Sequence, residues 1–145
     1  MKPVSELLKS RPSVLRTVRP DASVFEALGI LAEHEVGALV VMEGDRMAGV
    51  VSERDYTRKV ALQGRSSKDT KVSEIMTANV FVVSPASRTR DCMTLMREKR
   101  IRHLPVVEGG RVMGVISIGD VVKDNIRQMG QQINFLETYI KGHGA

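Results

Sequence analysis

The sequence predicts a mixed α/β (α+β) fold in which one β-α-β-β-α unit occurs twice. Two observations predict this: an internal repeat at an offset of 65 residues, and the same order of apolar segments and turns in each copy. Residues 18–58 align with 83–123 without a gap, and residues 4–6 match 72–74 more weakly at an offset of 68. Because two copies are too few for a solenoid, we expect them to face each other across a pseudo-twofold axis.

Each element of the unit follows from its local sequence. A short extended segment ends before a proline, and an amphipathic helix with apolar residues at helical spacing follows it. Two apolar strands come next, and Gly44-Asp45 or Gly109-Gly110 between them is typical of a hairpin. A second helix begins beside Ser52 or Ser117. The two copies give extended segments at 14–18 and 80–83, helices around 24–31 and 92–96, first strands at 38–42 and 104–107, and second strands at 47–51 and 112–116.

The organisation of the chain follows from the repeat and from one polar stretch. Residues 63–70 are polar and rich in turn formers, which is typical of a linker between the two copies. We therefore expect the first repeat at 1–66, the second at 67–127 and a C-terminal helical extension at 128–145.

Composition narrows the class of protein. The 145 residues are 42% hydrophobic, enough for a buried core, yet no apolar run is long enough to span a bilayer. The first residues lack the apolar stretch of a signal peptide, and the single cysteine cannot form an internal disulfide. We therefore expect a cytoplasmic protein that does not enter a membrane.

The charge and the side-chain inventory limit the chemistry. A net charge of +5 favours an anionic partner, but the few scattered aromatic residues argue against a nucleic-acid binder. A phosphate-binding loop, paired catalytic carboxylates and a nucleophilic triad are all missing from the sequence, and the three histidines lack metal-ligand spacing. We expect neither an enzyme nor a metal protein.

A Gly-x-x-Ser-x-x-Asp motif closes both copies. Its glycine lets a backbone or a ligand approach the strand closely, and its serine can cap the next helix or donate to a phosphate. The aspartate falls in the first helical turn, where its carboxylate can accept hydrogen bonds from both hydroxyls of a ribose. The two motifs consist of Gly49, Ser52 and Asp55, and of Gly114, Ser117 and Asp120.

Together with the Leu-Pro-Val-Val sequence at 104–107, these motifs resemble a CBS domain, and the whole chain resembles a tandem CBS pair, or Bateman module, of the stand-alone bacterial signal-transduction type. In that family the two repeats pack sheet against sheet and leave two related clefts. The clefts bind adenosine derivatives such as AMP, ADP, ATP, NAD(H) or S-adenosylmethionine. The resemblance implies an energy sensor in which nucleotide occupancy changes the packing of the repeats or of two subunits. A module that regulates a separate effector protein in trans is the alternative.

The resemblance also implies that each cleft takes its serine and aspartate from one copy and its adenine-facing strand from the other. One cleft would combine Ile116, Ser117 and Asp120 with Thr17, Ala22, Val36 and Gly37. The other would combine Val51, Ser52, Arg54 and Asp55 with Ile101, Arg102 and His103. Val82 is the second-copy equivalent of Thr17, so the Asp55 cleft lacks one hydroxyl group that could contact a nucleotide. We therefore expect the two clefts to differ in affinity or ligand, and we expect the Asp120 cleft, which has the Thr17 hydroxyl, to be the better binding site.

The C-terminal segment carries an apolar stripe. Its residues recur at spacings of 4, 3, 4, 3 and 4, which is the a/d pattern of a coiled coil, and they are Val122, Ile126, Met129, Ile133, Leu136 and Ile140. Such a helix could lie on its own domain, but its length favours a partner, so we expect a homodimer. Gly130 weakens the helix by about 1 kcal/mol relative to alanine.

Overall fold

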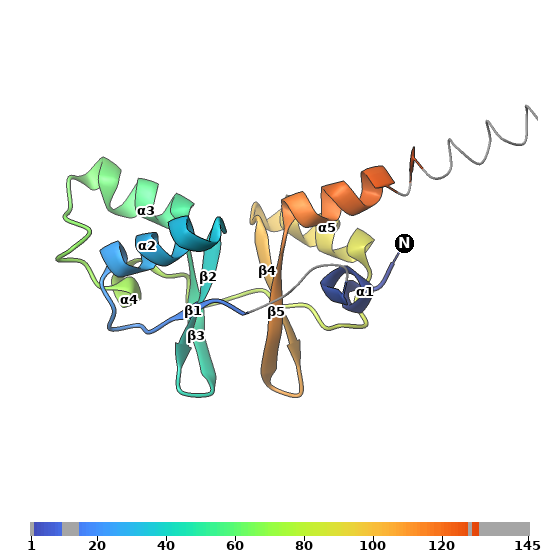
Figure 1. Ribbon diagram of the computed structural model, residues 1–145, viewed down its shortest axis with the longest axis horizontal. Coiled ribbons are helices and arrows are strands. Elements are labelled where there is room, and N and C mark those ends of the chain that lie inside the picture. The colour runs from blue at the N-terminus through green and yellow to red at the C-terminus, as the bar shows by residue number, and fades with distance from the viewer. Residues whose placement is uncertain (1, 10–14, 128, 131–145) are drawn as a thin grey trace, which may run out of the picture.

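The structure, a computed structural model, describes residues 2–9, 15–127 and 129–130. The first copy forms a three-stranded sheet in the order β1 (Thr17–Val18), β2 (Ala38–Glu43) and β3 (Arg46–Ser52). The second copy forms a two-stranded sheet of β4 (His103–Glu108) and β5 (Arg111–Ser117). Figure 1 shows the two sheets beside each other at the centre, with helices on the outer side of each.

The helices follow the predicted order. The first copy contributes α2 (Val24–His34) and α3 (Glu53–Lys59), with a short 3₁₀ turn at Ala61–Gln63, and the second contributes α5 (Thr89–Lys99) and a helix at 118–127. Two short helices, α1 (Val4–Lys9) and α4 (Val72–Ile75), precede the copies. Among the described residues, every helix is too short or too polar to cross a bilayer.

The backbone repeats in detail. β2 pairs in parallel with β1 and antiparallel with β3, and β4 pairs antiparallel with β5. In the second copy the extended segment contributes one parallel bridge, Val83 to Val106, in place of a strand. Both hairpins carry an irregularity at equivalent places, between Val41 and Met42 and between Val106 and Val107. The pseudo-twofold relation predicted from the sequence therefore extends to strand register.

Strand residues alternate between two buried environments. Leu39 and Val41 of β2 pack with the helices of the first copy. Ala38 and Val40 point to the opposite face, yet they are 7% and 0% exposed. Pro105 of β4 is likewise buried without belonging to the helix-side core of its copy. The second sheet lies on that side in Figure 1, so the two sheets face each other and bury these residues between them.

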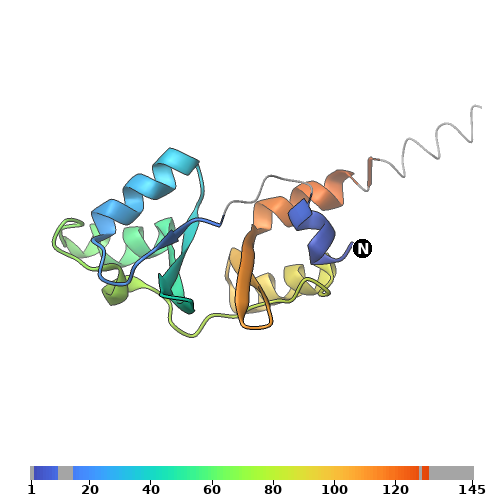
Figure 2. The ribbon, with the colours of Figure 1, turned by 60° about the horizontal axis from the view of Figure 1, so that its bottom comes forward.

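The two short helices are exchanged between the copies. Val4 and Leu7 of α1 belong to the core of the second copy, whereas Val72 and Ile75 of α4 belong to the core of the first. Backbone hydrogen bonds fix α1 there, with the Val4 N–H donating to a carbonyl beside α5 at 2.7 Å. Figures 1 and 2 both show the dark-blue α1 among the helices of the second copy. The copies are thus joined by more than the linker.

The C-terminal stripe is exposed where the structure describes it. Val122, Ile126 and Met129 are 41%, 62% and 53% exposed. The rest of the stripe, Ile133, Leu136 and Ile140, lies outside the described residues, as does the expected extension at 128–145 apart from residues 129 and 130.

Candidate functional site

A cavity of about 620 Å³ opens where the first copy meets the second. The first copy contributes the end of β3 and the start of α3 to its lining. The second copy contributes the extended segment and the residues just before β4. Its lining consists of Gly37, Val50, Ser52, Glu53, Arg54, Asp55, Thr57, Arg58, Thr77, Asn79, Val80, Phe81, Arg100, Ile101, Arg102 and His103. The structure therefore brings Asp55 together with five other residues predicted for this cleft: Ser52, Arg54, Ile101, Arg102 and His103.

A capping box fixes the first-copy side of the cavity. The Ser52 N–H donates to Asp55 Oδ2 at 2.9 Å, and the Asp55 N–H donates to Ser52 Oγ at 3.2 Å. This reciprocal pair satisfies two backbone donors at the start of α3 and holds the carboxylate against the strand end.

Lys59 holds the other oxygen of the same carboxylate. Its Nζ lies 3.2 Å from Asp55 Oδ1 and donates to the Ile75 carbonyl of α4 at 2.7 Å. The Asp55 side chain is 16% exposed and that of Lys59 is 44% exposed, so only the carboxylate side of this ion pair is shielded from water. A carboxylate has about four acceptor positions, so Oδ1 can still accept from a ligand hydroxyl.

His103 fills the wall between the copies. Its imidazole lies against Gly37, where a Cβ atom would be 3.1 Å from Nε2, so only a glycine fits there without displacing the ring. Burial lowers the pKa of His103; the nearby Asp120 carboxylate opposes this, and Arg102 adds to the lowering. The imidazole is therefore neutral at pH 7. Gly37, expected in the Asp120 cleft, lines this cavity.

The cavity rim is cationic. Arg54, Arg58, Arg100 and Arg102 are all exposed, and none of their guanidinium groups has a hydrogen bond or ion pair with another described residue. Arg100 ends α5 in the left-handed region, with φ of 55°. Phe81, 44% exposed, adds an aromatic face with Lys99 Nζ 5.2 Å from its centroid.

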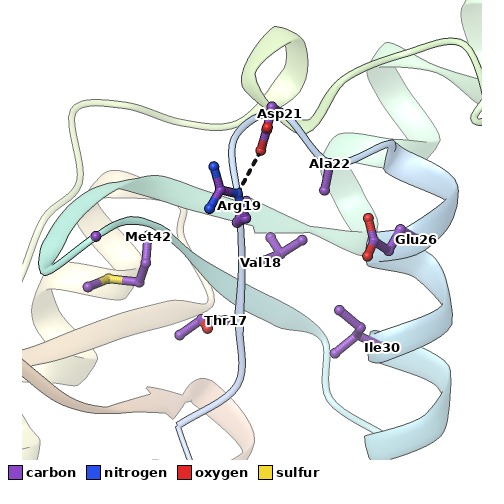
Figure 3. Close-up of a pocket in the computed structure, with 9 residues that line it drawn as sticks. Thr17, Val18, Arg19, Asp21, Ala22, Glu26, Ile30 and Met42 are labelled. Atoms are coloured by element: carbon purple, nitrogen blue, oxygen red, sulfur yellow. Dashed lines mark hydrogen bonds and ion pairs between the residues drawn. The ribbon is translucent and has the colours of Figure 1, made fainter.

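The residues predicted for the other cleft are found partly in a helix cap and partly in a separate cavity. Ser117 and Asp120 form the same cap, with the Ser117 N–H donating to Asp120 Oδ2 at 2.8 Å. Thr17 and Ala22 line a separate cavity of about 650 Å³, beside an ion pair in which Arg19 lies 3.0 Å from the Asp21 carboxylate (Figure 3). The serine and aspartate do not line that cavity.

Three further predicted residues pack into the cores. Val51 and Ile116 are 1% and 0% exposed, so their side chains belong to the helix-side cores. Val36 packs at the edge of the first core. Val14 corresponds in sequence to Asn79 of the Asp55 cavity, and it lies outside the described residues.

Sequence reasoning missed part of the lining. Thr77, Asn79, Val80 and Phe81 carry no motif, and only the sheet-to-sheet arrangement brings them to the cavity. Arg58 had a usable signal, because it follows Arg54 by four residues and so shares its helix face. The described residues hold no group of three His, Cys, Asp or Glu side chains that could bind a metal ion.

Comparison with known proteins agrees with this geometry. The CBS domain matches the chain at residues 4–62 and again at 72–125. The mitochondrial CBS domain-containing protein CBSX3 of Arabidopsis thaliana is 42% identical over 127 residues, which cover 84% of this chain but 62% of that longer protein.

Two solved structures have the same fold. A protein with CBS domains from Burkholderia ambifaria has a TM-score of 0.84 at 50% identity, covering 87% of this chain and 95% of that one. A CBS domain protein from Pyrobaculum aerophilum, solved in complex with AMP, has a TM-score of 0.73 at 31% identity, covering 82% and 89%. The two family matches, in register with the two structural copies, show that the chain belongs to the CBS domain family as a tandem pair of CBS repeats.

Proposed function

We propose that this CBS pair is a non-catalytic regulatory module that binds an adenosine nucleotide in the cavity between its copies. The observation that carries the proposal is the joining, in one cavity, of an anchored carboxylate, an apolar wall and four unpaired guanidinium groups. The AMP complex of the Pyrobaculum aerophilum relative supports the same ligand class. AMP, ADP, ATP and NAD(H) all contain the chemistry that such a lining would recognise.

The lining suggests a division of roles. Asp55 would accept from the ribose hydroxyls, since its carboxylate is already held in place by Ser52 and Lys59. Val80 and Ile101 would contact the base, and the guanidinium groups would bind phosphate through their planar forks of donors.

Nucleotide binding would regulate by joining the two copies. The lining comes from both copies, so a bound ligand contacts both and stabilises their packing against separation. A ligand at 100 times its dissociation constant adds about 2.7 kcal/mol to the free energy of unfolding if it binds only the folded state. That change in packing is what a separate effector protein would detect.

Asp55→Asn tests the site directly. The amide keeps the size of the side chain but loses the charge, and a charge-assisted hydrogen bond is worth roughly 1.5–3 kcal/mol, so affinity should fall at least about tenfold. Titration calorimetry with AMP, ATP and NADH measures this. Asp45→Asn, in an exposed hairpin turn, is the matched control and should bind as the unmodified protein does. Equal affinities for the two variants would refute the assignment of the site.

We also propose that two copies associate through the exposed stripe on the helix that starts at residue 118. Ile126 and Met129 are more than half exposed, and the a/d pattern continues in the sequence beyond them. Isoleucine occupies the a positions 126, 133 and 140, and leucine one d position, a combination that favours two parallel strands. A second copy of this chain therefore matches the stripe.

Sedimentation over a range of concentrations tests the association. Ile126→Glu should shift the chain toward monomer, because the charge would be buried in the seam, whereas Arg127→Glu, at an exposed b position away from the seam, should leave the dimer intact. Both variants should retain nucleotide binding. A monomer for the unmodified chain at high concentration, or an unchanged dimer for Ile126→Glu, would contradict the proposal.

A further inference from the structure

The four cavity arginines differ from three of the other described arginines, whereas Arg97 and Arg111, like them, have no carboxylate within 4 Å among the described residues. Arg19, Arg46 and Arg65 each lie within 4 Å of a carboxylate. The four cavity arginines have no such partner, although Glu53 and Asp55 line the same cavity. Four guanidinium groups against two carboxylates leave two net positive charges, and the neutral His103 adds none.

The pseudo-twofold relation gives an internal comparison for this charge. The residues that correspond to Arg100 and Arg102 are Glu35 and Gly37 in the other copy. Glu35 adopts the same left-handed backbone as Arg100, with φ of 52° against 55°. The backbone is therefore the same at the two positions, while the charge is reversed.

The remaining equivalent positions are mixed. Gly119 corresponds to Arg54 and removes a positive charge, Lys123 corresponds to Arg58 and keeps it, and Arg16 corresponds to the uncharged Phe81. Among the described equivalents of the whole lining, Arg102 itself lines the Asp55 cavity, and the others hold two positive charges, on Arg16 and Lys123, and two negative charges, on Glu35 and Asp120. Positive charge is therefore in excess around the Asp55 cavity, whereas the charges at these equivalent positions balance.

A difference in positive charge between the two sides would distinguish ligands by their number of phosphate groups. A nucleoside monophosphate carries up to two negative charges, which two guanidinium groups can bind, whereas a di- or triphosphate carries three or four and can engage all of them. An unpaired cationic rim costs free energy through mutual repulsion, and that repulsion is relieved most by the most highly charged ligand.

Resting on the proposed nucleotide site, we infer that the Asp55 cavity selects nucleoside di- and triphosphates over monophosphates and that the Asp120 side does not. The chain then binds one polyphosphate. The adenosine part is bound in the same way in every ligand of the series, and the arginines at 54, 58, 100 and 102 distinguish its members.

Calorimetry of the full chain with adenosine, AMP, ADP and ATP tests the inference, at low salt and with EDTA so that ATP is free of magnesium. ATP should bind at least about tenfold more tightly than AMP, with one ATP per chain, and its affinity should fall more steeply with salt. Arg100→Glu installs the residue that the first copy has in the same backbone conformation, so the fold should tolerate it. Arg100→Glu and Arg102→Gln should each bring the ATP-to-AMP ratio close to one. Arg97→Gln, an exposed arginine of α5 outside the cavity, should not change the ratio.

The outcomes separate the two proposals. AMP and ATP bound equally well, or a ratio that Arg100→Glu leaves unchanged, overturns the selection of polyphosphate and leaves the nucleotide site standing. Two equivalent ATP molecules per chain overturn the assignment to one side. If neither adenosine nor any of the nucleotides binds, the proposed function itself fails.

Discussion

Gly49 and Gly114 occupy the same place in the two copies, yet we expect alanine to have very different effects at the two positions. A Cβ on Gly49 would lie 2.5 Å from the Thr77 carbonyl oxygen, which belongs to the backbone. A Cβ on Gly114 would lie 3.1 Å from Leu8 Cδ2, the end of a flexible side chain. Neither glycine has a positive φ, so alanine is compatible with both backbones and only the available space differs.

The cost follows from what must move. For Gly49→Ala the segment at Thr77 must shift, which disturbs the two hydrogen bonds between Val50 and Thr77, of 3.0 and 2.9 Å. Overpacking of this kind costs about 1–3 kcal/mol, and each weakened hydrogen bond adds up to about 1 kcal/mol. For Gly114→Ala the Leu8 side chain can rotate away from the new methyl group. Alanine also lowers the conformational entropy of the unfolded chain, which stabilises the folded protein by about 0.4–1 kcal/mol. The net change in the free energy of unfolding should therefore stay within about 1 kcal/mol.

Urea unfolding at equilibrium measures both values. Gly49→Ala should lower the free energy of unfolding by about 2–4 kcal/mol, and Tm by roughly 6–16 °C, given about 3–4 °C per kcal/mol for a chain of this size. Because Thr77 lines the cavity, the same variant should also weaken nucleotide binding. Equal losses for the two glycines would refute the reasoning, since it rests on the difference between a backbone atom and a side-chain end.

Two further predictions concern buried ionisable groups. Burial lowers the pKa of His103 below its usual 6.5, so His103 binds a proton more readily in the unfolded chain than in the folded one. The free energy of unfolding should therefore fall as the pH drops below about 6.5. His103→Gln should flatten the stability profile between pH 7 and 5, and an unchanged slope would contradict the assignment. Burial, with a smaller effect of Asp91, raises the pKa of Cys92 to about 11, so the thiol should react with a disulfide reagent at pH 8 only as fast as the chain unfolds. Rapid labelling of the native protein would show that the helix-side core opens locally.

The fold could be predicted because local chemistry specifies it twice. The glycines of the hairpins, the apolar spacing of α2 and α5, and the serine–aspartate caps are each readable from neighbouring residues. Two independent copies of the same pattern removed most of the ambiguity of each signal.

The exchange of α1 and α4 was not predictable in this way. Both helices are too short for a clear period, and nothing local states that Val4 packs with the second copy rather than the first. The same limit applies to Phe81 and Asn79, which reach the cavity through the packing of two sheets. Gly37, which we predict for the Asp120 cleft, also lines the Asp55 cavity, because its Cα lies against the His103 ring of the second copy.

The pseudo-symmetry separates what the fold requires from what the site requires. The strand irregularities, the left-handed ends of α2 and α5 and the serine–aspartate caps occur in both copies, because each solves a backbone problem that both copies have. The charged side chains around those positions are not repeated: Lys59, which holds the Asp55 carboxylate, corresponds to Asp124, which is buried and paired with Lys2 at 3.3 Å. Such a difference changes neither core nor strand pairing. Where the backbone is constant and the charge is not, the charge can differ without cost to the fold, and this supports the proposal that the two sides of the module differ in the ligand they bind.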